Sequence, residues 1–241
     1  MRFEWIMAAV FCAAPVLPAQ GAISSGTIIP ISLDTSIDAA RAHPGDIIRA
    51  TVMQDVPGTA IRRRARVVGH VVQASQVKGG QARLDISFDA VKIRGQMSPF
   101  KASVRALASF LEVEEAQIPE EMSSRGLTPE TWTTQQIGGD QFYRGGGPVA
   151  VGMTTVGKVT PWGALDLPRS QPGLPCRGAI GESSRPQAMW LFSSDACGVY
   201  GFEYLHIAHA GRTDPAGVIM LSSAKGKLKL GSGTGMLLRI S

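Results

Sequence analysis

The chain has 241 residues, of which 44% are hydrophobic and 18% are charged, and its formal net charge is +5. This composition excludes a disordered polyelectrolyte, and the length is sufficient for one large or two small domains. With 28 glycines and 15 prolines, the sequence favours many short strands joined by tight turns over a helical bundle.

The N-terminus has the pattern of a secretory signal. Arg2 precedes an uncharged apolar run over 6–17, which is about 12 residues long and too short for the roughly 20 that span a bilayer. Small residues follow, and cleavage is expected after Gly21 or Ala22, so that residues 1–22 form a signal peptide. An uncleaved anchor is the alternative. The sequence therefore predicts a periplasmic or secreted protein with no transmembrane span in the mature chain.

Two cysteines, Cys176 and Cys197, remain after the expected cleavage. In an oxidising compartment an even pair predicts a disulfide, here closing a loop of about 20 residues. A catalytic thiol would need an activating base, and a metal would need further ligands, so neither a metal nor another cofactor is expected.

Residues 23–110 have the pattern of core β-strands. The clearest strand is 83–89, where apolar and polar residues alternate in a way that one face of a helix cannot bury. The alternation then shifts phase, because Val91 is the next apolar strand position after Phe88, and this shift predicts a bulge near Ala90. Further strands are expected at 27–33, 46–56 and 66–74.

The rest of the chain divides into two segments. Residues 111–187 combine an acidic linker with Gly- and Pro-rich loops, and residues 188–241 return as strands that complete the β domain. These strands are predicted at 188–193, 199–209, 218–222 and 235–240. Ser-Gly-Thr precedes both the first strand, at 25–27, and the last, at 232–234, which suggests that the two strands are adjacent. The expected fold class is mainly β, a small barrel or sandwich with a loop-rich, disulfide-bonded elaboration.

Residues 26–105 carry a Pro-Gly-Asp turn at 44–46, a dense apolar strand at 67–72 and the alternating strand at 83–88. With this pattern the segment resembles the β-barrel domain of TrbI-type conjugation-channel proteins, and the resemblance implies a barrel and a role in a conjugation or secretion channel. Residues 192–201 with 208–213 are similar to a family of exported bacterial proteins of unassigned function.

Several residues have the chemistry of a catalytic or metal site. Ser193 or Ser194 with His206 or His209 supplies the residue types of a serine hydrolase, but the Gly-x-Ser-x-Gly elbow is absent. The two histidines have the spacing His-x-x-His, yet residues three apart on a strand point to opposite faces, so no metal site is predicted. Ser-x-x-Lys at 222–225 lacks the partner motifs of penicillin-recognising enzymes.

Positive charge is concentrated in two stretches. One is Arg62, Arg63, Arg64 and Arg66, and the other is Lys225, Lys227 and Lys229, where lysines alternate with other residues so that a strand would place them on one solvated face. Such a face attracts anionic polymers, or it protects a sheet edge from aggregation. Nucleic acid is not an expected partner, because export separates the chain from it.

The leading hypothesis is an exported cell-envelope protein that acts as a binding or structural module and is not an enzyme. Its partner would be an envelope protein or an anionic envelope polymer. The alternatives are a secreted serine hydrolase and a component of a conjugation or secretion channel. Aromatic and polar groups suited to a binding surface gather near the cysteines; these residues are Trp190, Tyr200, Tyr204, His206, His209 and Arg212. For Trp190 and Tyr204, burial as aromatics that fill the core is the favoured explanation.

Overall fold

The structure is a computed structural model, and it describes most of the two parts of the chain that the sequence predicts to be strand-rich. The described residues are 23–56, 58–77, 79–117, 192, 196–208 and 217–241, together with four short strand segments. Those segments pair as β8 (Glu120–Glu121) with β9 (Trp132–Thr133) and β10 (Val149–Val151) with β11 (Thr154–Gly157).

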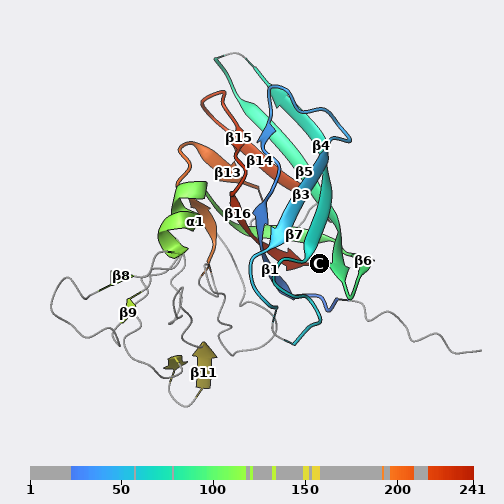
Figure 1. Cartoon of the computed structure of the whole chain (residues 1–241). Coiled ribbons are helices and arrows are strands. Elements are labelled where there is room, and N and C mark those ends of the chain that lie inside the picture. Colours follow the sequence, from blue (N-terminus) through green and yellow to red (C-terminus); the bar gives the residue numbers. More distant parts are fainter. Residues whose placement is uncertain are drawn as a thin grey trace, which may run out of the picture.

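One large sheet dominates the described residues, so the prediction of a mainly β protein is confirmed (Figure 1). Ten strands belong to this sheet: β1 (Ile28–Leu33), β3 (Ile47–Val52), β4 (Arg66–Gln76), β5 (Ala82–Ile93), β6 (Gln96–Pro99), β7 (Ala102–Ala108), β12 (Gly198–Tyr200), β13 (Leu205–Ile207), β14 (Ile219–Ser223) and β16 (Gly235–Ile240). A small ribbon pairs β2 (Ile37–Asp38) with β15 (Lys229–Leu230), and the helix α1 (Phe110–Gln117) follows β7.

The strand order is β12-β7-β16-β1-β3-β4-β5-β14-β13, with β6 paired to the far end of β5. Neighbours are antiparallel except β12 and β7, which are parallel. The first and last strands pair along their length, from Ile28 opposite Arg239 to Ser32 opposite Gly235, as the repeated Ser-Gly-Thr suggests. Strands from 23–110 and from 198–240 therefore share one sheet, whereas the strand predicted at 188–193 lies, apart from Phe192, outside the described residues.

The hydrogen-bonded order is open, which corrects the expectation of a closed barrel. Its end strands are β12 and β13, and among the described residues no ladder joins them. Both strands have three residues, and the turn between them contains two residues with left-handed backbone, Gly201 at φ 67° and Tyr204 at φ 60°. This turn interrupts the extended geometry, so the single strand predicted at 199–209 becomes two short strands without mutual pairing.

Two apolar layers hold the sheet. The main core lies on its inner face, where alternate side chains of each strand are buried; it includes Ile29, Ile31, Ile48, Val67, Leu84, Ile86, Phe88 and Leu238. A second layer covers the outer face of β1, β7 and β16 with residues from α1 and the segment before β12; it includes Ile28, Ala106, Val113, Phe192, Tyr200 and Leu237. Among the described residues, this layer covers the part of the outer face formed by β1, β7 and β16.

The predicted bulge is confirmed. Val68 pairs with Ala90 and Gly69 pairs with Phe88, so Asp89 is the extra residue on β5. The bulge returns Val91 to the core, where it is fully buried. No helix among the described residues is both long enough and apolar enough to cross a bilayer.

Candidate binding site

The structure describes three of the six predicted site residues. Tyr204 and His206 lie at the β13 edge, and Tyr200 lies on β12. Trp190, His209 and Arg212 lie outside the described residues.

The β13 segment presents Tyr204 and His206 to solvent, while its other residues belong to the core. Leu205 and Ile207 are 7% and 5% exposed, whereas Tyr204 is 44% exposed and His206 is also exposed. Within β13, an alternation of period 2 places His206 on the solvated face between buried Leu205 and Ile207, whereas Tyr204 precedes the strand with left-handed backbone. The prediction that Tyr204 is buried in the core is thus wrong.

His206 belongs to a row of polar residues that crosses four strands. It pairs with Ser222 on β14, Ser222 pairs with Arg83 on β5, and Arg83 pairs with Ser75 on β4. Residues directly opposite each other in a sheet lie on the same face. All four are exposed, so the row lies on the outer, solvated face.

Tyr204 directly precedes β13, and its ring contacts the ammonium group of a lysine. The Lys225 Nζ atom lies 3.5 Å from the centroid of the Tyr204 ring, a cation–π contact. A backbone hydrogen bond from the Ala224 N–H to the Tyr204 carbonyl, at 3.3 Å, holds the two segments together at this point. We call Tyr204, His206, Arg83, Ser222 and Lys225 the aromatic–cationic face.

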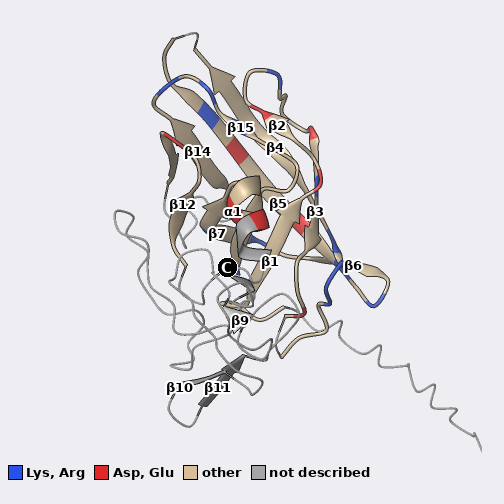
Figure 2. Cartoon of the chain, turned by 60° about the vertical axis from the view of Figure 1, so that its left-hand side comes forward, with Lys and Arg blue, Asp and Glu red and all other residues tan. Residues whose placement is uncertain are grey.

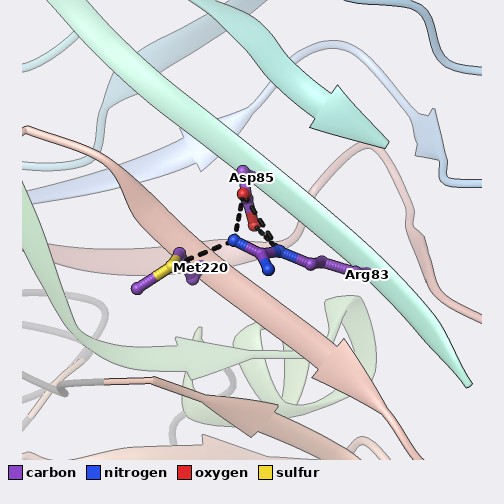
Figure 3. Close-up of polar contacts among 3 residues, drawn as sticks. All are labelled: Arg83, Asp85 and Met220. Carbon is purple, nitrogen blue, oxygen red and sulfur yellow. Dashed lines mark hydrogen bonds and ion pairs between the residues drawn. The ribbon is translucent and has the colours of Figure 1, made fainter. Parts of the chain in front are cut away.

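Arg83 is oriented by an ion pair on its own strand (Figure 3). Its Nη2 donates to Asp85 Oδ2 at 2.7 Å, and its Nε donates to Oδ1 at 2.9 Å. Nη2 also lies 3.3 Å from the Met220 sulfur on β14. The hydrogen bonds from Arg83 to Asp85, and then the charge of that carboxylate, raise the pKa of Arg83 above its usual value. The guanidinium, a cation as arginine always is, is thus held by Asp85 on β5 and lies beside Met220 on β14.

Tyr200 has a structural role and does not belong to this face. It is only 7% exposed, its hydroxyl donates to the Cys197 carbonyl at 3.0 Å, and it accepts from the Cys197 N–H at 3.2 Å. A buried phenol needs such partners. Cys197 is fully buried beside it, and Cys176 lies outside the described residues, so their disulfide stays a prediction.

The predicted catalytic combinations are not assembled within the described residues. Ser193, Ser194 and His209 lie outside them, and His206 is opposite Ser222 instead. The described part of the chain contains no group of three His, Cys, Asp or Glu side chains that could hold a metal ion.

The three predicted lysines are all exposed, but they do not share one strand. Lys225 lies in the turn after β14, while Lys229 begins β15 opposite Asp38. The intervening Leu228 and Leu230 are buried, as the alternation predicts.

Sequence reasoning missed Arg83 and Asp85, although the alternation of 83–89 places both on the polar face of β5. It also missed His70, whose Nδ1 lies 2.8 Å from Asp89 Oδ2 across the β4–β5 pair. A hollow of about 540 Å³ lies beside β2 and β3, and of the residues named from the sequence Lys229 lines it, while Tyr200, Tyr204 and His206 do not. Its polar lining includes Thr35, Ser36, Asp38, Arg41, Asp46, Arg49 and Lys229.

These observations define the class of the protein as an open, mainly antiparallel β-sheet with an exposed aromatic–cationic face. Comparison with protein-family models, curated proteins and solved structures finds no match to the chain. The resemblance of residues 26–105 to a conjugation-channel barrel thus gains no further support and stays an expectation.

Proposed function

We propose that the chain is an exported, non-catalytic binding module of the cell envelope, with the aromatic–cationic face as its recognition surface. The partner is an anionic envelope polymer. Lys225 and Arg83 supply the positive charge, and the flat ring of Tyr204 supplies contact area at low cost in side-chain entropy.

The conformation of Tyr204 is the observation that carries this proposal. A left-handed backbone costs a residue with a side chain about 1–3 kcal/mol, and Gly or Asn would fit more easily. Tyr204 has φ 60° and remains 44% exposed, so it does not recover this cost by burial. An exposed cation–π contact contributes only about 0.5–1 kcal/mol, which is less than the strain. A ring retained on the surface under these conditions supports a role in binding.

The replacement Tyr204→Asn tests the role of the ring, because Asn tolerates the left-handed conformation and the fold is expected to survive. Purified peptidoglycan sacculi, which carry carboxylates on a polymer of sugars and peptides, are the probe in a co-sedimentation assay. The wild-type protein is expected to sediment with sacculi, and Tyr204→Asn is expected to bind at least about fivefold more weakly.

Ile47→Gln is the matched control, since Ile47 is 51% exposed on β3 and lies outside the face. The control is expected to bind like the wild type. Equal binding by wild type and Tyr204→Asn, or no binding by the wild type, would contradict the proposal.

The alternative of a serine hydrolase has its own test. The folded protein is expected to remain unlabelled by a fluorophosphonate probe, which reacts with activated serines. Labelling that is lost in His206→Ala would instead favour the hydrolase and would count against a non-catalytic module.

A further inference from the structure

A second cationic surface lies at the opposite end of β5. Antiparallel pairing of Val67 with Val91 brings the start of β4 to the end of β5. The turn before β4 and the β5–β6 hairpin then meet at one end of the sheet (Figure 2). We call this region the basic tip; its exposed side chains are Arg62, Arg63, Arg64, Arg66, Lys92, Arg94 and Met97.

The basic tip has little negative charge to balance it. Asp55 is the only acidic residue among 53–66 and 90–98. Its carboxylate lies 3.8 Å from Arg62 Nη1 and accepts from the Arg63 N–H at 2.7 Å. Within these two stretches one carboxylate accompanies six cations, and the neighbouring carboxylates of Asp34 and Asp89 are bonded to the Thr51 hydroxyl and the His70 ring, so the tip keeps an excess of positive charge that attracts anions.

Backbone strain marks the same residues. Among the described residues, the non-glycine positions with left-handed φ are Tyr204, Arg64 at 66° and Arg94 at 48°. Arg94 and Gly95 form the two-residue turn of the β5–β6 hairpin, since Ile93 pairs with Gln96. Asn-Gly is the preferred sequence for such a turn. An Arg at each strained position is unfavourable for the backbone, which supports a use for its charge.

An exposed apolar side chain indicates the kind of anion. Met97 is 45% exposed and pairs with Lys92 across the hairpin. Cations around an apolar side chain fit a bilayer surface, where lipid phosphates meet the cations and the thioether enters the boundary with the acyl chains. A soluble polyanion would match the cations but would leave Met97 without a role.

We propose that the basic tip docks the protein on an anionic phospholipid surface. Arg83 and Lys92 are nine residues apart on β5, a separation of about 30 Å at the rise of a strand. The tip therefore acts independently of the aromatic–cationic face, and failure of one proposal leaves the other standing.

The double replacement Arg64→Asn with Arg94→Asn tests the proposal with a fold that should persist, because Asn suits both backbone conformations. The matched control is Lys227→Gln with Lys229→Gln, which removes two exposed cations elsewhere. Binding is measured by co-sedimentation with phosphatidylcholine vesicles that contain about 30% phosphatidylglycerol, a fraction giving a strongly negative surface. The double Asn variant is expected to partition roughly thirtyfold more weakly than wild type, and the lysine control much less so.

Further measurements separate lipid docking from general charge attraction. Met97→Ser is expected to weaken vesicle binding without changing the net charge, and added salt is expected to weaken wild-type binding. Equal losses of vesicle binding in the double Asn variant and in the lysine control would overturn the proposal. The proposal would also be overturned if the variant with Arg64→Asn and Arg94→Asn had the melting temperature of wild type and bound vesicles equally well. A wild-type protein that bound a soluble anionic polysaccharide but not vesicles would overturn it too.

Discussion

At the scale of single residues, Asp85 shows how the outer face of the sheet accommodates a nearly buried carboxylate. The side chain of Asp85 is 5% exposed and that of Arg83 is 50% exposed. The carboxylate thus depends on the bidentate hydrogen bonds from Arg83, while the guanidinium still reaches solvent. Arg83 consequently supports both the fold and the aromatic–cationic face.

Removal of the cation is expected to lower the free energy of unfolding. In Arg83→Gln the carboxylate of Asp85 loses its charged partner, at an expected cost of about 1–3 kcal/mol. Urea denaturation measures this change. Ser75→Ala, in the same row, serves as control and is expected to stay within about 0.5 kcal/mol of wild type. A variant Arg83→Gln as stable as this control would show that the ion pair does not contribute to stability.

At the scale of the elements, the β4–β5 pair connects the two proposed surfaces. At the bulge, Gly69 allows the backbone of β4 to pack closely against β5. A Cβ built on Gly69 would collide with the Ser87 carbonyl oxygen and would lie 3.0 Å from Phe88 Cδ1. These neighbours belong to β5, whose backbone is fixed by its ladder with β4. The position therefore requires glycine for space.

Gly69→Ala is expected to destabilise the protein by about 1–3 kcal/mol through overpacking. Gly231→Ala is the control, because a Cβ there has no heavy atom within 4 Å. Thermal unfolding of both variants measures the difference. If Gly69→Ala and Gly231→Ala unfolded at the same temperature, the close packing of β4 on β5 at this point would be contradicted.

The sequence predicts those elements whose side chains alternate clearly. The expected strand at 235–240 coincides with β16, and the expected strands at 27–33 and 218–222 lie within one residue of β1 and β14. The hairpin of β6 was missed because Arg94 and Gly95 do not form a usual turn sequence. The break between β12 and β13 was missed because nothing in the sequence marks Tyr204 as a left-handed residue.

Part of the candidate site could likewise be predicted from the sequence, and part could not. The alternation in 205–207 places His206 on the solvated face, so this part follows from the sequence, whereas the exposure of Tyr204 depends on the turn before the strand. The contact of Lys225 with Tyr204 depends on how a turn meets a strand end. The row through Arg83 depends on strand order, which local pattern does not determine.

At the scale of the whole molecule, chain ends that lie far apart in sequence are joined in one sheet. The pairing of β1 with β16 and of β14 with β5 makes residues 23–110 depend on residues 217–241. The same sheet separates the aromatic–cationic face from the basic tip. Together these features support a module with two recognition surfaces, one for an envelope polymer and one for an anionic bilayer.

Export is the claim on which this account depends most, because the proposed envelope polymer lies outside the cytoplasm. Mass spectrometry of the protein isolated from fractionated cells, with and without reduction, tests it directly. The account predicts a periplasmic or secreted product whose N-terminus lies near Ala22 or Ile23 and whose Cys176 and Cys197 are linked to each other. A cytosolic product that retains Met1 to Ala22, with both of these thiols reduced, would contradict it.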